Sequence, residues 1–151
     1  LRLLSDGLLW IILVLICSWV CDIAAFFVGR RWGNVKLAPR LSPGKSVEGA
    51  VGGLIGAVLA AILLGPLLFE VMVALGKPEG VPYGIVRLAG LGLVIGACAI
   101  AGDLMESFIK RQCGAKDSGA LIPGHGGVLD RIDSWLLAAV GAYFYLVLTA
   151  G

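Results

Sequence analysis

Long apolar blocks alternate with polar segments along the chain. The apolar blocks cover residues 7–28, 49–75, 84–103 and 134–150. A helix needs about 20 mostly apolar residues to cross the hydrocarbon core of a bilayer, and each block is close to that length. A soluble helical bundle would show polar residues at a helical period along each block, and these blocks have no such polar faces. The pattern therefore predicts an all-α fold, a polytopic membrane bundle with about four transmembrane helices.

Composition and charge agree with a membrane protein and orient it. Of the 151 residues 59% are hydrophobic and 15% are charged, too few charges for the surface of a soluble domain of this size. Nine of the twelve basic residues lie in the polar loops 29–48 and 104–133, namely Arg30, Arg31, Lys36, Arg40, Lys45, Lys110, Arg111, Lys116 and Arg131. Because positively charged loops stay in the cytoplasm, we expect both loops to face it. A net charge of +2 is too small to suggest nucleic acid, but its concentration on one side suits anionic lipid or phosphate.

Two acidic clusters flank the second polar loop. If the third apolar helix continues past its apolar block, one face of it carries Asp103, Glu106, Ser107 and Lys110. Asp130 and Asp133 lie three residues apart just before the last apolar block, so both clusters return to the same side of the membrane. Carboxylates brought together repel one another unless a cation or several donors neutralise them. Oxygen ligands without a sulfur cluster favour a hard cation such as Mg²⁺.

The segment between the clusters suits an anionic substrate. It is rich in glycine, whose backbone N–H groups can approach phosphate oxygens, and it holds basic side chains and His125. A metal ion, cations and exposed amides together are typical of phosphoryl or nucleotidyl transfer. His125 would bind phosphate or shuttle a proton, although a loop histidine bonded to the backbone explains it equally well. The chain has no P-loop sequence.

Two carboxylates lie within the apolar blocks. Asp22 and Glu70 are costly in lipid unless they are paired or hydrated. We expect Asp22 to face the site and Glu70, on the outer side, to be structural.

Glycines four residues apart let helix backbones approach closely, which favours tight packing within one bundle. The pairs are Gly49 with Gly53, Gly52 with Gly56, and Gly92 with Gly96.

Three segments resemble those of the phosphatidate cytidylyltransferases, also called CDP-diacylglycerol synthases. Residues 107–133 are similar to the signature of that family, whose fixed positions are met by Ser107, Lys110, Arg111, Lys116, Asp117, His125, Gly126, Gly127, Asp130, Arg131 and Asp133. Residues 41–53 resemble the family's other cytoplasmic loop, with Ser46 where threonine is more usual, and residues 21–33 resemble its aspartate-containing segment. Members of the family have additional N-terminal spans. The resemblance thus implies that residues 1–151 form one membrane-embedded unit, the C-terminal catalytic part.

The resemblance implies a reaction in which CTP and phosphatidic acid give CDP-diacylglycerol and pyrophosphate. Mg²⁺ is required, and the identity of any second cation stays open. The lipid phosphate oxygen attacks the α-phosphorus of CTP, so no protein nucleophile is needed. By position, the metal-linked catalytic carboxylates would be Asp103, Asp130 and Asp133. The substrate phosphates would be contacted by catalytic Lys110 and by Arg111, Lys116 and His125. The other loop would line the site with Ser42, Lys45 and Glu48. Arg131 would contact substrate or pair with Asp117.

Other functions remain open at this point. A CDP-archaeol synthase-like enzyme acting on ether lipids would use the same chemistry, and residue spacing does not separate the two. A membrane transporter for an anionic solute would also place carboxylates in spans, but it would not explain the glycine-rich cationic loop. A non-catalytic scaffold is a further alternative. We expect a multi-pass protein of the cell membrane whose partners are CTP, phosphatidic acid and the bilayer, without nucleic acid. Family members can be dimers, so a homodimer is a further expectation.

Overall fold

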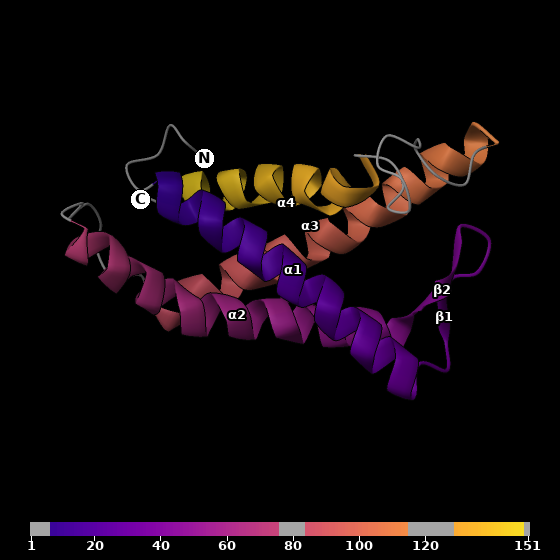
Figure 1. Cartoon of the computed structure of the whole chain (residues 1–151), viewed down its shortest axis with the longest axis horizontal. Helices are drawn as coiled ribbons and strands as arrows, with labels where there is room; N and C mark the ends of the chain where they lie inside the picture. The colour runs from indigo at the N-terminus through magenta and orange to yellow at the C-terminus, as the bar shows by residue number, and fades with distance from the viewer. Residues whose placement is uncertain (1–6, 76–83, 115–128, 150–151) are drawn as a thin grey trace.

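The computed structural model describes residues 7–75, 84–114 and 129–149, without the side chains of residues 129–131. The described part contains four helices and one two-stranded antiparallel sheet (Figure 1). Their order is α1 (Gly7–Trp32), β1 (Lys36–Ala38), β2 (Ser42–Ser46), α2 (Val47–Ala74), α3 (Ile85–Gln112) and α4 (Leu129–Leu148).

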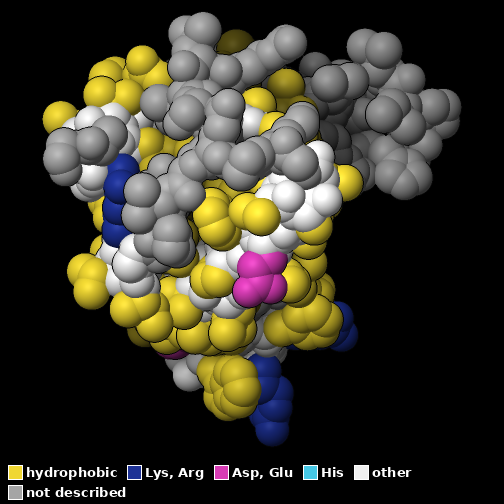
Figure 2. Space-filling view, turned by 90° about the vertical axis from the view of Figure 1, so that its left-hand side faces the viewer, with side chains coloured by type: hydrophobic (Ala, Val, Ile, Leu, Met, Phe, Trp, Pro, Cys, Tyr) yellow, Lys and Arg dark blue, Asp and Glu magenta, His cyan; other side chains and the backbone are white. Residues whose placement is uncertain are grey.

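The helices have the length and the surface of membrane spans. By length and composition α1, α2 and α3 are each able to cross a bilayer, whereas the apolar segment of α4, Ile132–Leu148, is shorter. Large hydrophobic side chains point outward along the helices, such as Phe27 and Leu63, which are 64% and 68% exposed. Among the described residues visible in Figure 2, which views the end opposite the β-strands, hydrophobic side chains are the most abundant. The predicted all-α membrane bundle is therefore confirmed.

Small residues bring the helix axes close together, as the glycine pairs predict. A Cβ atom placed on Gly49 of α2 would lie 2.8 Å from the carbonyl oxygen of Ala25 in α1. One placed on Gly92 of α3 would lie 2.7 Å from the carbonyl oxygen of Ala57 in α2. Neither neighbour is a flexible side chain, so a larger residue would separate the backbones. These glycines therefore serve contacts within the bundle.

The apolar core occupies one part of the bundle and leaves another part open. Its buried side chains come from the first half of α1, the middle of α2 and the apolar stretches of α3 and α4; the largest include Leu13, Leu91 and Ile95. The charged residues of the predicted site follow these stretches in α1 and α3 and precede them in α4. Polar groups therefore gather where the close packing of large apolar side chains ends.

The first polar loop folds into a short hairpin, which the hydropathy pattern does not predict. β1 and β2 pair antiparallel, with Lys36 opposite Ser46. The Ser46 side chain then caps α2 by accepting a hydrogen bond from the backbone N–H of Gly49 at 3.1 Å. Such a cap satisfies a donor that the helix itself leaves unpaired. Hydropathy misses the hairpin because its stability comes from backbone hydrogen bonds rather than from an apolar face.

The hairpin, the end of α3 and the start of α4 lie at the same end of the bundle. Figure 1 shows these three parts together, while the end of α2 and the start of α3 lie at the other end. α3 runs to Gln112, beyond the apolar block that predicted it, so the acidic stripe is helical as expected. The fold therefore brings the two acidic clusters and the first loop toward one another.

Candidate active site

Three carboxylates meet where α3 and α4 approach. Asp103 and Glu106 from α3 and Asp133 from α4 each offer an oxygen, and these oxygens all lie within 4.8 Å of one another. The close approach depends on Gly102, because a Cβ atom there would lie 2.7 Å from the carbonyl oxygen of Asp133. Glu106 is buried, and the other two carboxylates are half-buried. An oxygen-only cluster of this spacing is able to hold a hard divalent cation.

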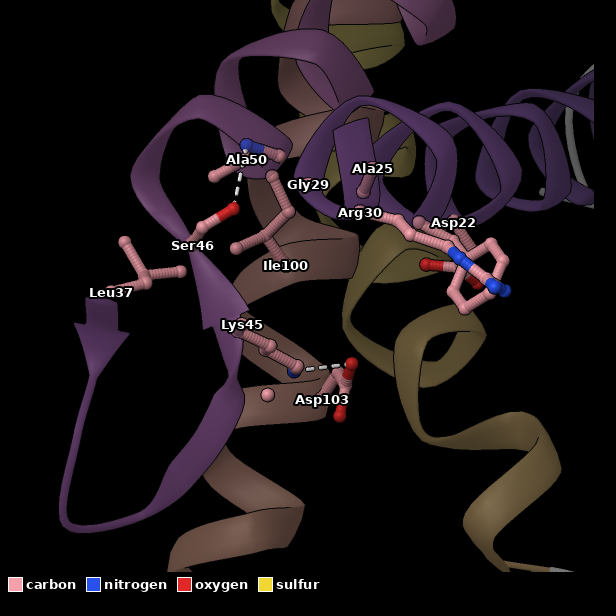
Figure 3. A pocket seen from close by; sticks show the side chains of 13 residues that line it. Asp22, Ala25, Gly29, Arg30, Leu37, Lys45, Ser46, Ala50, Ile100 and Asp103 are labelled. Carbon is pink, nitrogen blue, oxygen red and sulfur yellow. Dashed lines mark hydrogen bonds and ion pairs between the residues drawn. The ribbon is translucent and has the colours of Figure 1, made fainter. Parts of the chain in front are cut away.

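Two lysines from different elements face this acidic cluster. Lys45 of β2 forms an ion pair with Asp103 (Figure 3). Lys110 forms an ion pair with Glu106 one turn earlier in α3, with 2.8 Å between Nζ and Oε2. Opposite charges at this distance stabilise the ionised carboxylates. The hairpin thus contributes a charge to a cluster that otherwise belongs to α3 and α4.

The charged groups line two adjoining cavities. The acidic cavity has a volume of about 450 Å³, and its lining includes Trp19, Asp22, Asp103, Glu106, Lys110, Asp133, Ser134 and Trp135. The second cavity, of about 490 Å³, lies among α1, the hairpin, α2 and α3, and we call it the hairpin cavity. Asp22 and Asp103 line both cavities. The two spaces therefore share a charged wall.

Asp22 faces the site, as predicted from its place in an apolar block. It lies on α1 and is exposed to both cavities rather than to the apolar core. It shares the acidic cavity with Asp103 and Asp133. α1 thus adds a fourth carboxylate beside the three-carboxylate cluster. Glu70 lies at the other end of the bundle, on a separate cavity of about 230 Å³.

The structure separates the other predicted residues into three groups. Asp133 and Lys110 line the acidic cavity, and Lys45 lines the hairpin cavity. Three further residues lie at the hairpin end but line neither cavity: Ser42, Glu48 and Arg111. The Glu48 carboxylate accepts the Val35 N–H at 3.1 and 3.2 Å. Ser42 pairs with Ala38 in the sheet, and Arg111 donates to the Leu41 carbonyl at 3.5 Å. Asp130 and Arg131 begin α4, but their side chains lie outside the description, as do Lys116 and His125 entirely.

The sequence alone does not indicate a metal-binding role for Glu106 or a site role for two tryptophans. Glu106 was placed on the acidic stripe of α3, yet it is not a fixed position of the signature that the chain resembles. Trp19 and Trp135 line the acidic cavity, with ring centroids 5.6 Å apart. A usable signal existed for Trp19, which lies three residues before Asp22 and therefore on the same side of α1.

Comparison with known proteins identifies the family. The model of the cytidylyltransferase family matches residues 1–149. The phosphatidate cytidylyltransferase of Pseudomonas aeruginosa is 51% identical over 98% of this chain and 50% of its own length. Those of Synechocystis and Haemophilus influenzae are 42% and 46% identical, over 94% and 92% of this chain and 44% and 46% of their own lengths. The chain spans about half the length of these curated relatives, and it belongs to the cytidylyltransferase family.

Proposed function

We propose that the full-length protein transfers the cytidylyl group of CTP to phosphatidate, forming CDP-diacylglycerol and pyrophosphate. A phosphate oxygen of the lipid forms a bond to the α-phosphorus of CTP. The bond from that phosphorus to the bridging oxygen breaks, and pyrophosphate leaves with the electron pair. The observation that carries the proposal is the meeting of Asp22, Lys45, Asp103, Glu106, Lys110 and Asp133 around two adjoining cavities in a membrane bundle. The relatives named phosphatidate cytidylyltransferase support the choice of substrates.

The acidic cluster fits Mg²⁺, because its three carboxylates offer only oxygen ligands within 4.8 Å of one another. Asp103, Glu106 and Asp133 would hold the ion. When bound, Mg²⁺ would offset negative charge on the triphosphate. The predicted contribution of Asp130 is compatible with this assignment, since it lies one helical turn before Asp133.

Lys45 and Lys110 would contact phosphate oxygens. Each ammonium group lines one of the cavities and is paired with a carboxylate of the cluster. Positive charge held in a partly buried site stabilises the charge that develops during phosphoryl transfer without reorganising solvent. The two lysines would therefore orient the substrates and stabilise the transition state, while the attacking oxygen comes from the lipid.

The direct test incubates full-length protein with radiolabelled CTP, phosphatidic acid and Mg²⁺, followed by lipid extraction. We expect label in the lipid phase, one pyrophosphate for each labelled lipid, and loss of the product in excess EDTA. Parallel reactions with ATP and with an ether-linked phosphatidate compare nucleotide and lipid preference. Absence of labelled lipid with either lipid would refute the activity, and full activity in excess EDTA would refute the metal assignment.

We also propose that the hairpin end faces the cytoplasm, because the basic residues concentrate there. Single cysteines at Gly44 and Gly84 probe the two ends, since a Cβ atom on either glycine has no neighbour within 4 Å. Both are introduced in a Cys113→Ser background. In intact cells an impermeant thiol reagent should label only the position-84 cysteine. Labelling of position 44 instead would reverse the topology. That the protein is a homodimer stays a prediction, which the mass of the solubilised protein checks.

A further inference from the structure

The hairpin cavity has a composition unlike that of the acidic cavity. Its wall is largely apolar, with Ala25, Phe26, Leu37, Ala50 and Ile100 among its lining residues. Basic side chains enter it from two directions, Arg30 from α1 and Lys45 from β2 (Figure 3). A cavity with an apolar wall and a cationic end suits a molecule with an apolar body and an anionic headgroup.

The cavity continues onto the apolar outer surface of the bundle. Phe26 lines the cavity and is nevertheless 59% exposed, so it lies at the rim. Beyond it, Ile23 and Phe27 of α1 and Val51 of α2 are also exposed. The basic residues Arg30 and Arg31 end α1 at this level. This is the depth at which lipid headgroups meet acyl chains, since basic residues mark the end of a span.

Arg30 is available to an anion. Its guanidinium lies 6.0 Å from the centroid of the Phe26 ring, and within the described part of the chain it has no carboxylate at ion-pair distance. The first turn of α2 also borders the cavity, with Ser46 and Gly49 in its lining. The N-terminal end of a helix carries partial positive charge, which adds to the preference for a negative ligand.

We propose that the hairpin cavity binds the phosphate and glycerol backbone of the anionic lipid substrate, with Arg30 as a phosphate contact. This assignment rests on the proposed function, and it divides the site between two substrates. Lipid phosphate in the hairpin cavity and nucleotide triphosphate in the acidic cavity would meet across Asp22 and Asp103, the wall that both cavities share. Holding the two reacting phosphates side by side supplies the proximity that the transfer needs.

The neighbouring arginines provide a matched test. Arg30 lines the cavity, whereas Arg31 lies 5.9 Å from the Trp32 ring and is not in the lining. Both are exposed and carry the same charge on the same turn, so replacing either changes the general attraction to anionic lipid equally. In full-length protein in mixed micelles, Arg30→Gln should raise the KM for phosphatidate roughly tenfold and leave the KM for CTP within about twofold. Arg31→Gln should change both values by less than about twofold.

A binding measurement without CTP separates this inference from the proposed reaction. Full-length protein reconstituted with phosphatidylcholine and a small fraction of phosphatidate is analysed by native mass spectrometry. We expect retained phosphatidate in the wild type and Arg31→Gln, and several-fold less in Arg30→Gln. A bulky substitution at the cavity wall, Ile100→Trp, should also reduce retention, whereas Leu93→Trp on the exposed face of α3 should not.

The outcomes are distinct. If Arg30→Gln raises the KM for CTP and leaves that for phosphatidate unchanged, the hairpin cavity holds the nucleotide and the inference is wrong. Equal effects of Arg30→Gln and Arg31→Gln would reduce Arg30 to a general surface charge and also overturn it. If the wild type retains phosphatidate through Arg30 but forms no labelled product, the lipid site stands and the proposed reaction falls.

Discussion

The two ends of the bundle use charged side chains in different ways. At the hairpin end, Asp22, Asp103 and Asp133 face cavities. At the other end, the Arg87 guanidinium donates to the Thr149 hydroxyl at 3.0 Å and to the Leu146 carbonyl at 3.4 Å. Arg87 therefore caps the last turn of α4, where carbonyl groups lack helical partners.

This difference separates structural from functional charges in a membrane protein. Arg87 and Asp22 each interrupt an apolar block, so hydropathy alone makes them equally conspicuous. The bonds of Arg87 close a helix end, and Tyr145 adds a hydrogen bond from its hydroxyl to the Arg87 carbonyl at 3.0 Å. Asp22 instead lines two cavities beside other carboxylates. A charge in a span thus points to function when it shares a cavity with other charged side chains, as Asp22 does. Arg87 bonds to a backbone carbonyl instead, and Glu70 lines a cavity whose other lining residues are uncharged.

The largest expected effect comes from removing one carboxylate at the hairpin end. Asp103→Asn is nearly isosteric but removes the anionic oxygen that a hard cation requires. Because metal stabilisation is worth several kcal/mol, the rate of CDP-diacylglycerol formation should fall at least about 100-fold. Glu70→Gln makes the same chemical change at the other end and should leave the rate within about twofold. Comparable losses in both variants would erase the distinction between the ends.

The next effect comes from the close approach that assembles the acidic cluster. In Gly102→Ala the added methyl group meets the carbonyl oxygen of Asp133, so α3 and α4 must move apart. A displacement of a few tenths of an ångström should lower kcat about tenfold while the protein remains in the membrane. Gly84→Ala, at the start of the same helix, has open space around the new methyl group and serves as control. An unchanged kcat in Gly102→Ala would mean that this spacing is not critical.

Two glutamates that differ in surroundings should respond differently to the same substitution. Glu106 belongs to the three-carboxylate cluster, so Glu106→Gln should raise the Mg²⁺ concentration for half-maximal rate at least about tenfold. Glu48 accepts the Val35 N–H with a charged oxygen in the first turn of α2, so Glu48→Gln weakens this bond and removes a favourable charge at the helix N-terminus. It should lower the melting temperature in detergent and leave the Mg²⁺ dependence unchanged. The opposite result would exchange their roles, making Glu48 a site residue and Glu106 a structural one.

The smallest effect lies at the Arg87 end. Tyr145→Phe removes the hydroxyl that donates to the Arg87 carbonyl, and it should reduce the free energy of unfolding by about 1 kcal/mol. The rate and both KM values should not change, because this end holds none of the described cavity-lining charges of the proposed site. A loss of activity without a loss of stability would show that the two ends are coupled.

The sequence predicted the helical bundle and the approach of Asp103 and Asp133, but not Glu106 as the third carboxylate of the cluster. Apolar blocks report burial in lipid, so the helices were found, although α1 and α3 run past their apolar blocks to Trp32 and Gln112. Spacing placed Asp103, Glu106 and Lys110 on one face and brought Asp133 to the same end. It could not show that Glu48 bonds to Val35, because that contact depends on the hairpin. Nor could it reveal two cavities with one shared wall, which arise from the crossing of α1, α3 and the hairpin.

The central claim is that the carboxylates at the hairpin end hold a divalent cation. Its most direct test is Mn²⁺ binding to full-length protein without substrates. Binding is measured as the loss of the free Mn²⁺ signal in electron paramagnetic resonance. We predict saturable binding in the wild type and in Glu70→Gln, and at least about tenfold weaker binding in Asp133→Asn. Equal Mn²⁺ affinity in the wild type and Asp133→Asn would contradict the assignment of the acidic cluster as the metal site.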